Sequence, residues 1–163
     1  MTHQTILVLD FGSQYTQLIA RRLRELAVYT EVVPWHEPVE RILARRPAGI
    51  VLSGGPRSVR EAGAPRCSPA LLEANVPVLG ICYGMQLMTD LLGGQVEPAP
   101  NREYGPAAVT PAQPRGALFE GLPDTLDVWA SHGDLVASAP PGFRVVATSA
   151  NAPVAAMEDV RGR

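Results

Sequence analysis

The sequence contains no lysine, only two cysteines and no apolar run long enough to span a membrane. Without lysine there is no phosphate-binding P-loop, whose lysine must reach the phosphates. Two cysteines, Cys67 and Cys82, cannot by themselves build a disulfide framework or a four-ligand zinc site. A bilayer span needs about 20 consecutive apolar residues. We therefore expect no membrane association and no structural metal, and a location in the cytoplasm, where free thiols persist.

The sequence also lacks a large excess of positive or negative charge, since its net charge is -2. Proteins that bind nucleic acid present a basic face or stripe, and nothing here provides one. A chain of 163 residues buries roughly 70% of its unfolded surface, which suits one substantial core. We expect one domain over residues 1–163 and no nucleic-acid partner.

The first half of the chain alternates short apolar runs with amphipathic segments. Apolar runs of this kind are typical of strands buried on both faces of a parallel sheet. The first helical segment places Tyr15, Leu18, Ile19, Leu23 and Leu26 on one face. The alternation predicts an α/β fold, an open, mostly parallel sheet with right-handed crossovers and helices on both faces. The predicted strands are 5–10, 29–33, 49–53 and 76–81, and the predicted helices are 15–26, 38–46, 69–75 and 85–92.

The pattern changes beyond Gly94, where prolines become frequent and the apolar runs shorten. Proline removes a backbone donor and is rare in the middle of a sheet. We expect short, partly antiparallel strands joined by ordered loops in this half.

Cys82 is the residue best placed for chemistry, in the segment Gly80-Ile81-Cys82-Tyr83-Gly84 between a predicted strand and a predicted helix. Glycines two residues to either side let neighbouring backbone pass closely, as at a nucleophile elbow. A thiol at a helix N-terminus is expected to have a lowered pKa and to react near neutral pH. The alternative is an inert core cysteine. Cys67 is expected to be structural or exposed.

The segment Ser53-Gly54-Gly55-Pro56 directly follows a predicted strand. A glycine-rich turn at the carboxyl end of a parallel sheet can aim backbone N–H groups at a ligand. If this strand neighbours the one that leads to Cys82, the N–H groups of Gly55 and Tyr83 could stabilise an oxyanion. The alternative is a tight turn without chemistry.

A third polar cluster, Ser131-His132-Gly133-Asp134, follows the strand-like run Val128-Trp129-Ala130. His132 is a candidate general base for Cys82, by analogy with other cysteine–histidine pairs. We expect this histidine in a loop between strands, where a histidine as often orients another group or binds a ligand.

These motifs together resemble the class I (triad) glutamine amidotransferases. The resemblance rests on Leu9 to Tyr15, on Ser53 to Pro56 and on Gly80 to Gln86. Three further segments, 102–105, 118–121 and 128–134, are similar to the amidotransferase domains of the GMP synthase family. The resemblance covers essentially the whole chain and implies a flavodoxin-like or Rossmann-like sheet.

The resemblance implies a glutaminase in which Cys82 attacks the side-chain amide of glutamine. It implies backbone oxyanion donors at Gly55 and Tyr83. In the family, ammonia passes to an ATP-pyrophosphatase (synthetase) domain or subunit that uses ATP and magnesium to convert xanthosine monophosphate (XMP) to GMP. It also implies a homodimer for the full-length protein and no cofactor in this domain. The implied glutamine-binding residues are Gly55, Gln86, Ser131, His132 and Gly133.

One part of the family pattern is missing. Members carry the catalytic histidine and glutamate in a His-Pro-Glu segment, and the sequence contains no such segment. We expect a chain cut before that segment and without turnover of its own, the alternative being a natural short pseudoenzyme. Two other functions remain open: a noncatalytic glutamine-sensing or subunit-docking module, and a cysteine hydrolase of the α/β-hydrolase type.

Overall fold

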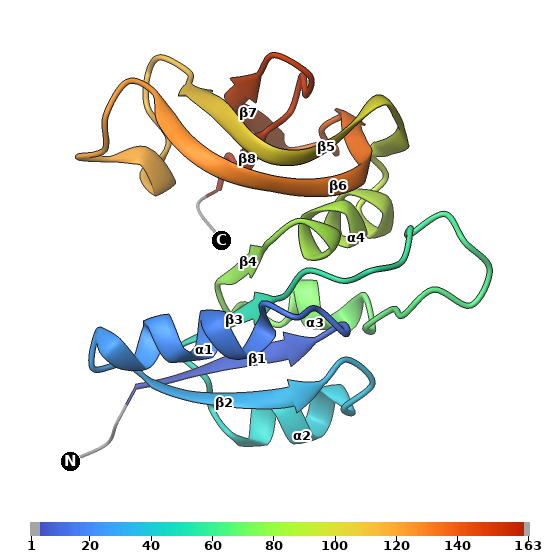
Figure 1. The fold of residues 1–163 in the computed structure, drawn as a ribbon. Helices are drawn as coiled ribbons and strands as arrows, with labels where there is room; N and C mark the ends of the chain where they lie inside the picture. The colour runs from blue at the N-terminus through green and yellow to red at the C-terminus, as the bar shows by residue number, and fades with distance from the viewer. Residues whose placement is uncertain (1–3, 162–163) are drawn as a thin grey trace. The chain divides into compact units, whose positions relative to one another are not determined.

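The computed structural model describes residues 4–161, and for residues 101–103 the backbone only. The chain forms two compact units, one ending at Met88 and the other beginning at Thr89. Each unit is built around its own sheet (Figure 1).

A four-stranded parallel sheet with the order β2-β1-β3-β4 forms the first unit. Strands and helices alternate along the chain, which confirms the predicted parallel α/β arrangement. The elements are β1 (Thr5–Asp10), α1 (Thr16–Glu25), β2 (Tyr29–Pro34), α2 (Val39–Ala44), β3 (Gly49–Leu52), α3 (Ala70–Glu73) and β4 (Val78–Gly80). Helix α4 (Tyr83–Leu91) follows and contains the boundary between the units.

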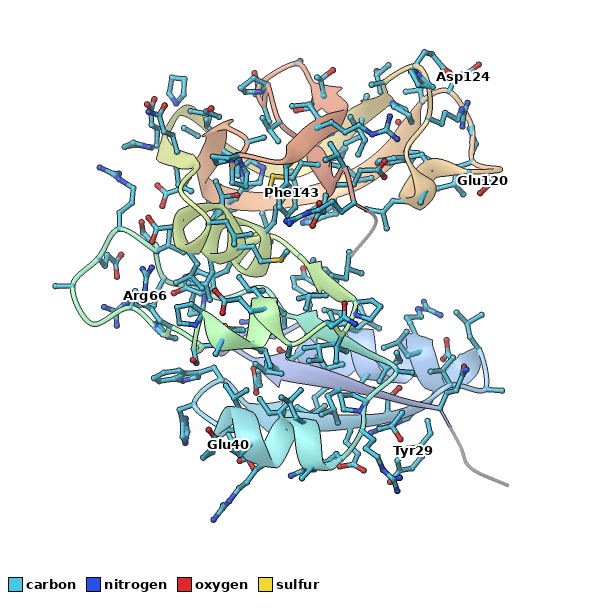
Figure 2. The ribbon with its side chains drawn as sticks, turned by 180° about the vertical axis from the view of Figure 1, so that it is seen from behind. Tyr29, Glu40, Arg66, Glu120, Asp124 and Phe143 are labelled. Atoms are coloured by element: carbon cyan, nitrogen blue, oxygen red, sulfur yellow. The ribbon has the colours of Figure 1, made fainter. Side chains whose placement is uncertain are left out.

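The helices of the first unit lie on both faces of its sheet. Helix α1 covers one face, and α2 and α3 cover the other, as the two opposite views show (Figures 1 and 2). The chain runs outward from β1 to β2 and then crosses back to β3, so right-handed crossovers must place α1 and α2 on opposite faces. This change of direction makes β1 and β3 a topological switch point, beyond whose carboxyl ends such sheets bind ligands.

The two central strands supply the core of the first unit. Leu7, Val8 and Leu9 of β1 have no exposed surface. All four residues of β3 are buried as well. Both strands are covered on two faces, as their apolar sequences predicted.

The predicted inward face of α1 is confirmed only in part, since of its five residues Ile19 and Leu23 are half-buried. Tyr15, Leu18 and Leu26 are exposed, and the buried residues of the helix are Thr16 and Ala20. The hydroxyl of Thr16 makes hydrogen bonds at the ends of β1 and β3, which turns this side of the helix toward the sheet.

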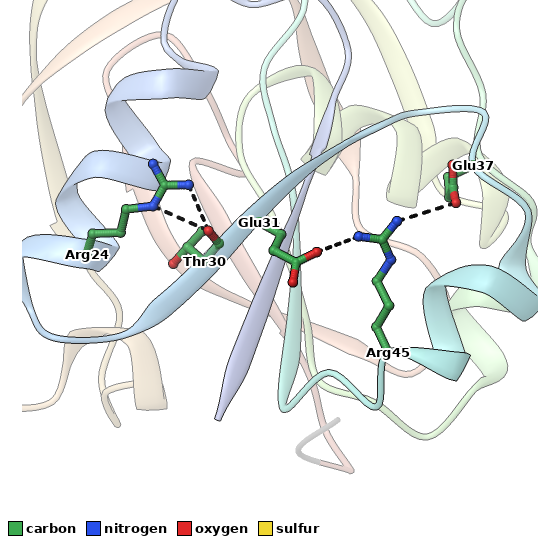
Figure 3. A network of polar contacts seen from close by, with 5 residues as sticks. All are labelled: Arg24, Thr30, Glu31, Glu37 and Arg45. Carbon is green, nitrogen blue, oxygen red and sulfur yellow. Dashed lines mark hydrogen bonds and ion pairs between the residues drawn. The ribbon is translucent and has the colours of Figure 1, made fainter. Parts of the chain in front are cut away.

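Side chains tie the edge strand β2 to segments on both sides of it (Figure 3). The guanidinium of Arg24 on α1 donates to the carbonyl of Thr30, with Nη2 at 2.7 Å. Arg45, just after α2, forms ion pairs with Glu31 on β2 and with Glu37. Partly exposed pairs of this kind contribute about 1 kcal/mol or less each, so they hold β2 in place without dominating stability.

The second unit contains an antiparallel sheet with the order β6-β5-β7-β8. Its elements are β5 (Gln95–Pro111), a 3-10 turn (Ala117–Phe119), β6 (Leu126–Ser138), β7 (Phe143–Ser149) and β8 (Ala156–Asp159). Phe119, Val146 and Ala147 form the centre of a small apolar cluster in it. The antiparallel pairing was expected in this half of the chain.

Two of these strands are much longer than expected, with 17 residues in β5 and 13 in β6. Two prolines of β5, Pro98 and Pro100, lie at an interruption of its pairing with β6 between Pro98 and Glu103, whereas Pro106 stays paired with Trp129. A break in the ladder removes the need for the missing proline donor. No helix within residues 4–161 is long and apolar enough to cross a membrane.

Candidate functional site

Cys82 occupies the sharp turn between β4 and α4. Its φ angle is 52°, in the left-handed region that residues other than glycine rarely adopt. The N–H of Gln86 donates to the carbonyl of Cys82 at 3.0 Å, so the helical hydrogen bonds start at this residue. A strained residue at the start of a helix is the geometry of a nucleophile elbow, as the sequence predicted.

The flanking glycines of this turn are required by close backbone contacts. A Cβ atom on Gly84 would lie 2.2 Å from the carbonyl oxygen of Leu52 on β3. A Cβ atom on Gly80 would lie 2.7 Å from the backbone nitrogen of Met85. Only glycine permits these approaches, so Gly84 is required by the packing of the turn against β3 and Gly80 by the close return of the chain at the start of α4.

The glycine-rich turn after β3 lies directly beside Cys82. Strands β3 and β4 are neighbours, with Leu52 opposite Gly80. A Cβ atom on Gly54 would be 3.7 Å from the Cβ of Cys82 and 3.4 Å from the hydroxyl oxygen of Ser13. The predicted proximity of this turn to Cys82 is confirmed. That the N–H groups of Gly55 and Tyr83 act as oxyanion donors stays a prediction.

The side chain of Tyr83 fixes the surroundings of the turn. It is 1% exposed, and its ring centroid lies 5.4 Å from that of Phe11. Its hydroxyl donates to the carbonyl of Pro65 at 2.6 Å, on the long connection between β3 and α3 where Figure 2 labels Arg66. Burial raises the pKa of Tyr83, so the phenol stays protonated and acts as an anchor.

A buried polar network joins the ends of β1 and β3. The hydroxyl of Ser53 accepts from the N–H of Phe11 at 3.1 Å, and the hydroxyl of Thr16 lies 3.1 Å from it. The single proton of the Thr16 hydroxyl is shared between the Ser53 oxygen and the carboxylate of Asp10, which lies 2.9 Å away. Sequence reasoning missed Asp10 and Thr16. A signal was available in the sequence. Asp10 ends one apolar strand and Ser53 directly follows another, so polar residues at the ends of two neighbouring parallel strands could have been expected to meet.

Burial determines the ionisation of Cys82. It raises the pKa of the thiol, and the N–H of Tyr83 opposes this only in part. The expectation that the helix N-terminus lowers this pKa is therefore wrong, because desolvation of the thiolate outweighs the favourable backbone group. Burial raises the pKa of Cys67 as well, and because Cys67 is buried, the structural one of its two expected alternatives fits and the exposed one does not.

Comparison with known proteins agrees with this geometry. The sequence model of the family described as glutamine amidotransferase class-I matches residues 7–162. The chain belongs to the class I glutamine amidotransferases.

Several members of the family are closely similar to this amidotransferase chain. A glutamine-hydrolyzing GMP synthase of Parafrankia sp. is 57% identical over 157 residues, which cover 96% of this chain and 29% of the relative. One from Streptomyces coelicolor is 55% identical over 155 residues, which cover 95% of this chain and 30% of the relative. The chain therefore spans about 30% of the length of these curated relatives.

Solved structures share the amidotransferase fold. A protein from Thermoplasma acidophilum, described as a proposed GMP synthase subunit, is 31% identical with a TM-score of 0.87, covering 98% of this chain and 80% of that one. A glutamine amidotransferase from Thermotoga maritima is 25% identical with a TM-score of 0.73, and the match covers 93% of this chain and 70% of that one. These likenesses confirm the predicted fold class.

The remaining predicted site residues lie on two different elements of the amidotransferase. Gln86 is 6% exposed, one turn into α4 after Cys82. Ser131, His132 and Gly133 lie inside β6, where His132 is opposite Glu103. The expectation of a loop at His132 is therefore wrong, because Ser131 and His132 still pair with Tyr104 and Glu103 of β5, and within this polar segment the ladder is interrupted only at Gly133. A role for these four residues in glutamine binding stays a prediction.

Alkylation of Cys82 by iodoacetamide is expected to accelerate as the pH rises past the ordinary thiol pKa of about 8.5. Only the thiolate reacts, and burial disfavours the thiolate. The measurement is the rate of modification of the Cys82 peptide between about pH 6 and 10, followed by mass spectrometry, with the Cys67 peptide as internal comparison. A rate that levels off below about pH 7.5 would contradict the raised pKa.

Proposed function

We propose that this chain is the glutaminase part of a GMP synthase and that Cys82 is its nucleophile. The observation that carries the proposal is the strained Cys82 at the start of α4 with the Gly54–Gly55 turn packed against it. Its close relatives, which are glutamine-hydrolyzing GMP synthases, supply the reaction.

The proposed chemistry begins with attack by the Cys82 sulfur on the side-chain amide carbon of glutamine. The carbonyl oxygen takes the negative charge, and the N–H groups of Gly55 and Tyr83 stabilise it. As the C–N bond breaks, the thiol proton leaves with the amide nitrogen as ammonia and a thioester remains. Water then cleaves the thioester, which gives glutamate and restores the thiol.

Substrate contacts are proposed for Gln86, Ser131, His132 and Gly133, with Gly55 also lining the pocket. Gln86 follows Cys82 by one turn and is buried, so its amide is close to the nucleophile in the chain and shielded from water. Buried amides provide the paired donors and acceptors that a glutamine substrate needs.

The ammonia is proposed to serve a synthetase domain or subunit that binds ATP and magnesium and aminates XMP to GMP. We further propose that residues 1–163 form a single amidotransferase domain, that the full-length protein is a homodimer and that it acts in the cytoplasm. These proposals rest on the family of the relatives, of whose length this chain spans about 30%.

The test is an assay of the polypeptide encoded by the gene with glutamine, ATP and XMP. Glutamate release coupled to GMP formation is the expected result. Glutaminase activity without GMP formation would overturn the assignment to GMP synthesis, and glutamine binding without turnover would favour the sensing module. The 163-residue chain alone is expected to release little glutamate, because removing members of a catalytic triad costs about 10⁴-fold or more. Full turnover by that chain would restore His132 as the base.

A further inference from the structure

The hydroxyl of Ser53 contacts the glycine-rich turn beside Cys82 and has no role in the chemistry proposed above. Ser53 has no exposed surface. Its hydroxyl donates to the carbonyl oxygen of the next residue, Gly54, at 3.0 Å. The same oxygen accepts from the N–H of Phe11 at 3.1 Å and from the hydroxyl of Thr16 at 3.1 Å. These contacts leave the single hydroxyl proton of Ser53 for the Gly54 carbonyl.

The contact with Gly54 controls the direction of a second group. The carbonyl of Gly54 and the N–H of Gly55 belong to one planar peptide unit, in which a trans bond points them in opposite directions. Glycines flank this peptide on both sides, and glycine gives the backbone its widest torsional freedom. A hydrogen bond that holds the Gly54 oxygen therefore also fixes where the Gly55 N–H points.

The Gly54–Gly55 peptide borders the nucleophile. A Cβ atom on Gly54 would be 3.7 Å from the Cβ of Cys82, and one on Gly55 would be 3.2 Å from Cγ of Tyr83. A rotated peptide would turn an N–H away from the reacting carbonyl and present a carbonyl oxygen in its place. A carbonyl oxygen repels a developing oxyanion, whereas an N–H stabilises it.

We propose that Ser53 is a positioning residue, whose hydroxyl holds the Gly54–Gly55 peptide so that the Gly55 N–H faces the substrate carbonyl. This inference rests on the proposed function, in which Gly55 supplies an oxyanion donor. Ser53 touches no reacting atom and acts only through the peptide.

Two alkylating reagents separate this role from a general loss of structure. Iodoacetamide reports the accessibility and ionisation of Cys82, because its carbon loses iodide in a direct displacement. The chloroketone analogue of glutamine carries –CO–CH₂Cl in place of the amide. The thiolate adds to its ketone to give an oxyanion, and displacement of chloride then leaves a thioether. Both reactions are run on the 163-residue chain at about pH 9, where thiolate is available without a base.

The variant Ser53→Ala is expected to lower the maximal rate of chloroketone labelling about 10- to 100-fold, a fraction of what loss of an oxyanion donor costs. Its half-saturating concentration and its iodoacetamide rate are expected to stay within about twofold, since neither depends on the Gly55 N–H. Ser53→Cys keeps a similar volume and a weak donor. Its chloroketone labelling rate should therefore lie between that of Ser53→Ala and that of the unmodified chain.

Thr16→Val is the matched control, because it removes a neighbouring buried hydroxyl and leaves the Ser53–Gly54 contact in place. It is expected to lose stability without losing chloroketone labelling relative to iodoacetamide. Chloroketone labelling of Ser53→Ala and Ser53→Cys at the rate of the unmodified chain would overturn the inference and leave the proposed function intact. Chloroketone labelling of the unmodified chain that does not saturate, or that glutamine does not slow, would overturn both. If Ser53→Ala does not fold, Ser53→Cys and Thr16→Val decide the question.

Discussion

Replacing Gly84 by alanine is expected to destabilise the first unit by about 3 kcal/mol or more, beyond the usual cost of overpacking. The new Cβ would lie 2.2 Å from the carbonyl oxygen of Leu52 and 2.7 Å from its carbonyl carbon. Both are backbone atoms of β3, which pairs with β1 and β4. The clash therefore cannot be relieved by a side-chain rotation, and α4 must move away from the sheet.

Urea unfolding followed by circular dichroism measures this effect. Because domains are stable by only about 5–15 kcal/mol, the loss should lower the urea midpoint clearly. Gly63→Ala is the matched control. Gly63 has a φ of 72° and no atom within 4 Å of the added Cβ, so this change should cost only about 1 kcal/mol of left-handed strain. Equal costs for the two variants would contradict the assigned clash.

Replacing Cys82 by glycine is expected to abolish chloroketone labelling and to lower glutaminase turnover of the gene-encoded polypeptide about 10⁴-fold or more. Without the sulfur no thioester can form. The stability should change little, because the left-handed φ of 52° costs a cysteine about 1–2 kcal/mol. Glycine removes that cost and loses roughly 0.5–1 kcal/mol to the greater freedom of the unfolded chain.

Cys82→Ala is the matched control, since alanine also lacks the sulfur but keeps the strained φ. We expect both variants to be inactive and Cys82→Gly to be the more stable by about 1 kcal/mol in urea unfolding. Residual turnover close to that of the unmodified protein would exclude Cys82 as the nucleophile. A more stable alanine variant would show that the turn is not strained.

Features that depend on neighbouring residues in the chain were predictable. Apolar runs located β1 and β3, because strands buried on both faces admit few polar residues. The glycines around Cys82 located the turn, because close backbone approach and a strained turn need glycine nearby. The motif spacing was sufficient to indicate the family, which the match over residues 7–162 confirms.

Features that depend on distant contacts were predicted wrongly or missed. The buried face of α1 differs from the predicted one, and it includes Thr16, which forms a hydrogen bond with Ser53, 37 residues away. The periodicity of apolar residues along a helix contains no information about such a distant polar partner. The lengths of β5 and β6 depend on the bonds between them, so frequent prolines suggested shorter strands than those found. The same pairing places His132 within a strand.

The sequence by itself therefore determined the order of the elements in the first unit, the turn that carries Cys82 and the family. The tertiary structure alone decided the raised pKa of Cys82, because burial depends on what packs around the thiol. It alone revealed the Ser53 hydroxyl as the link between β1, α1 and the Gly54–Gly55 turn. The physical reason is range: backbone torsions and amphipathic patterns are local, whereas desolvation and the Phe11–Ser53 hydrogen bond join residues that are adjacent only after folding.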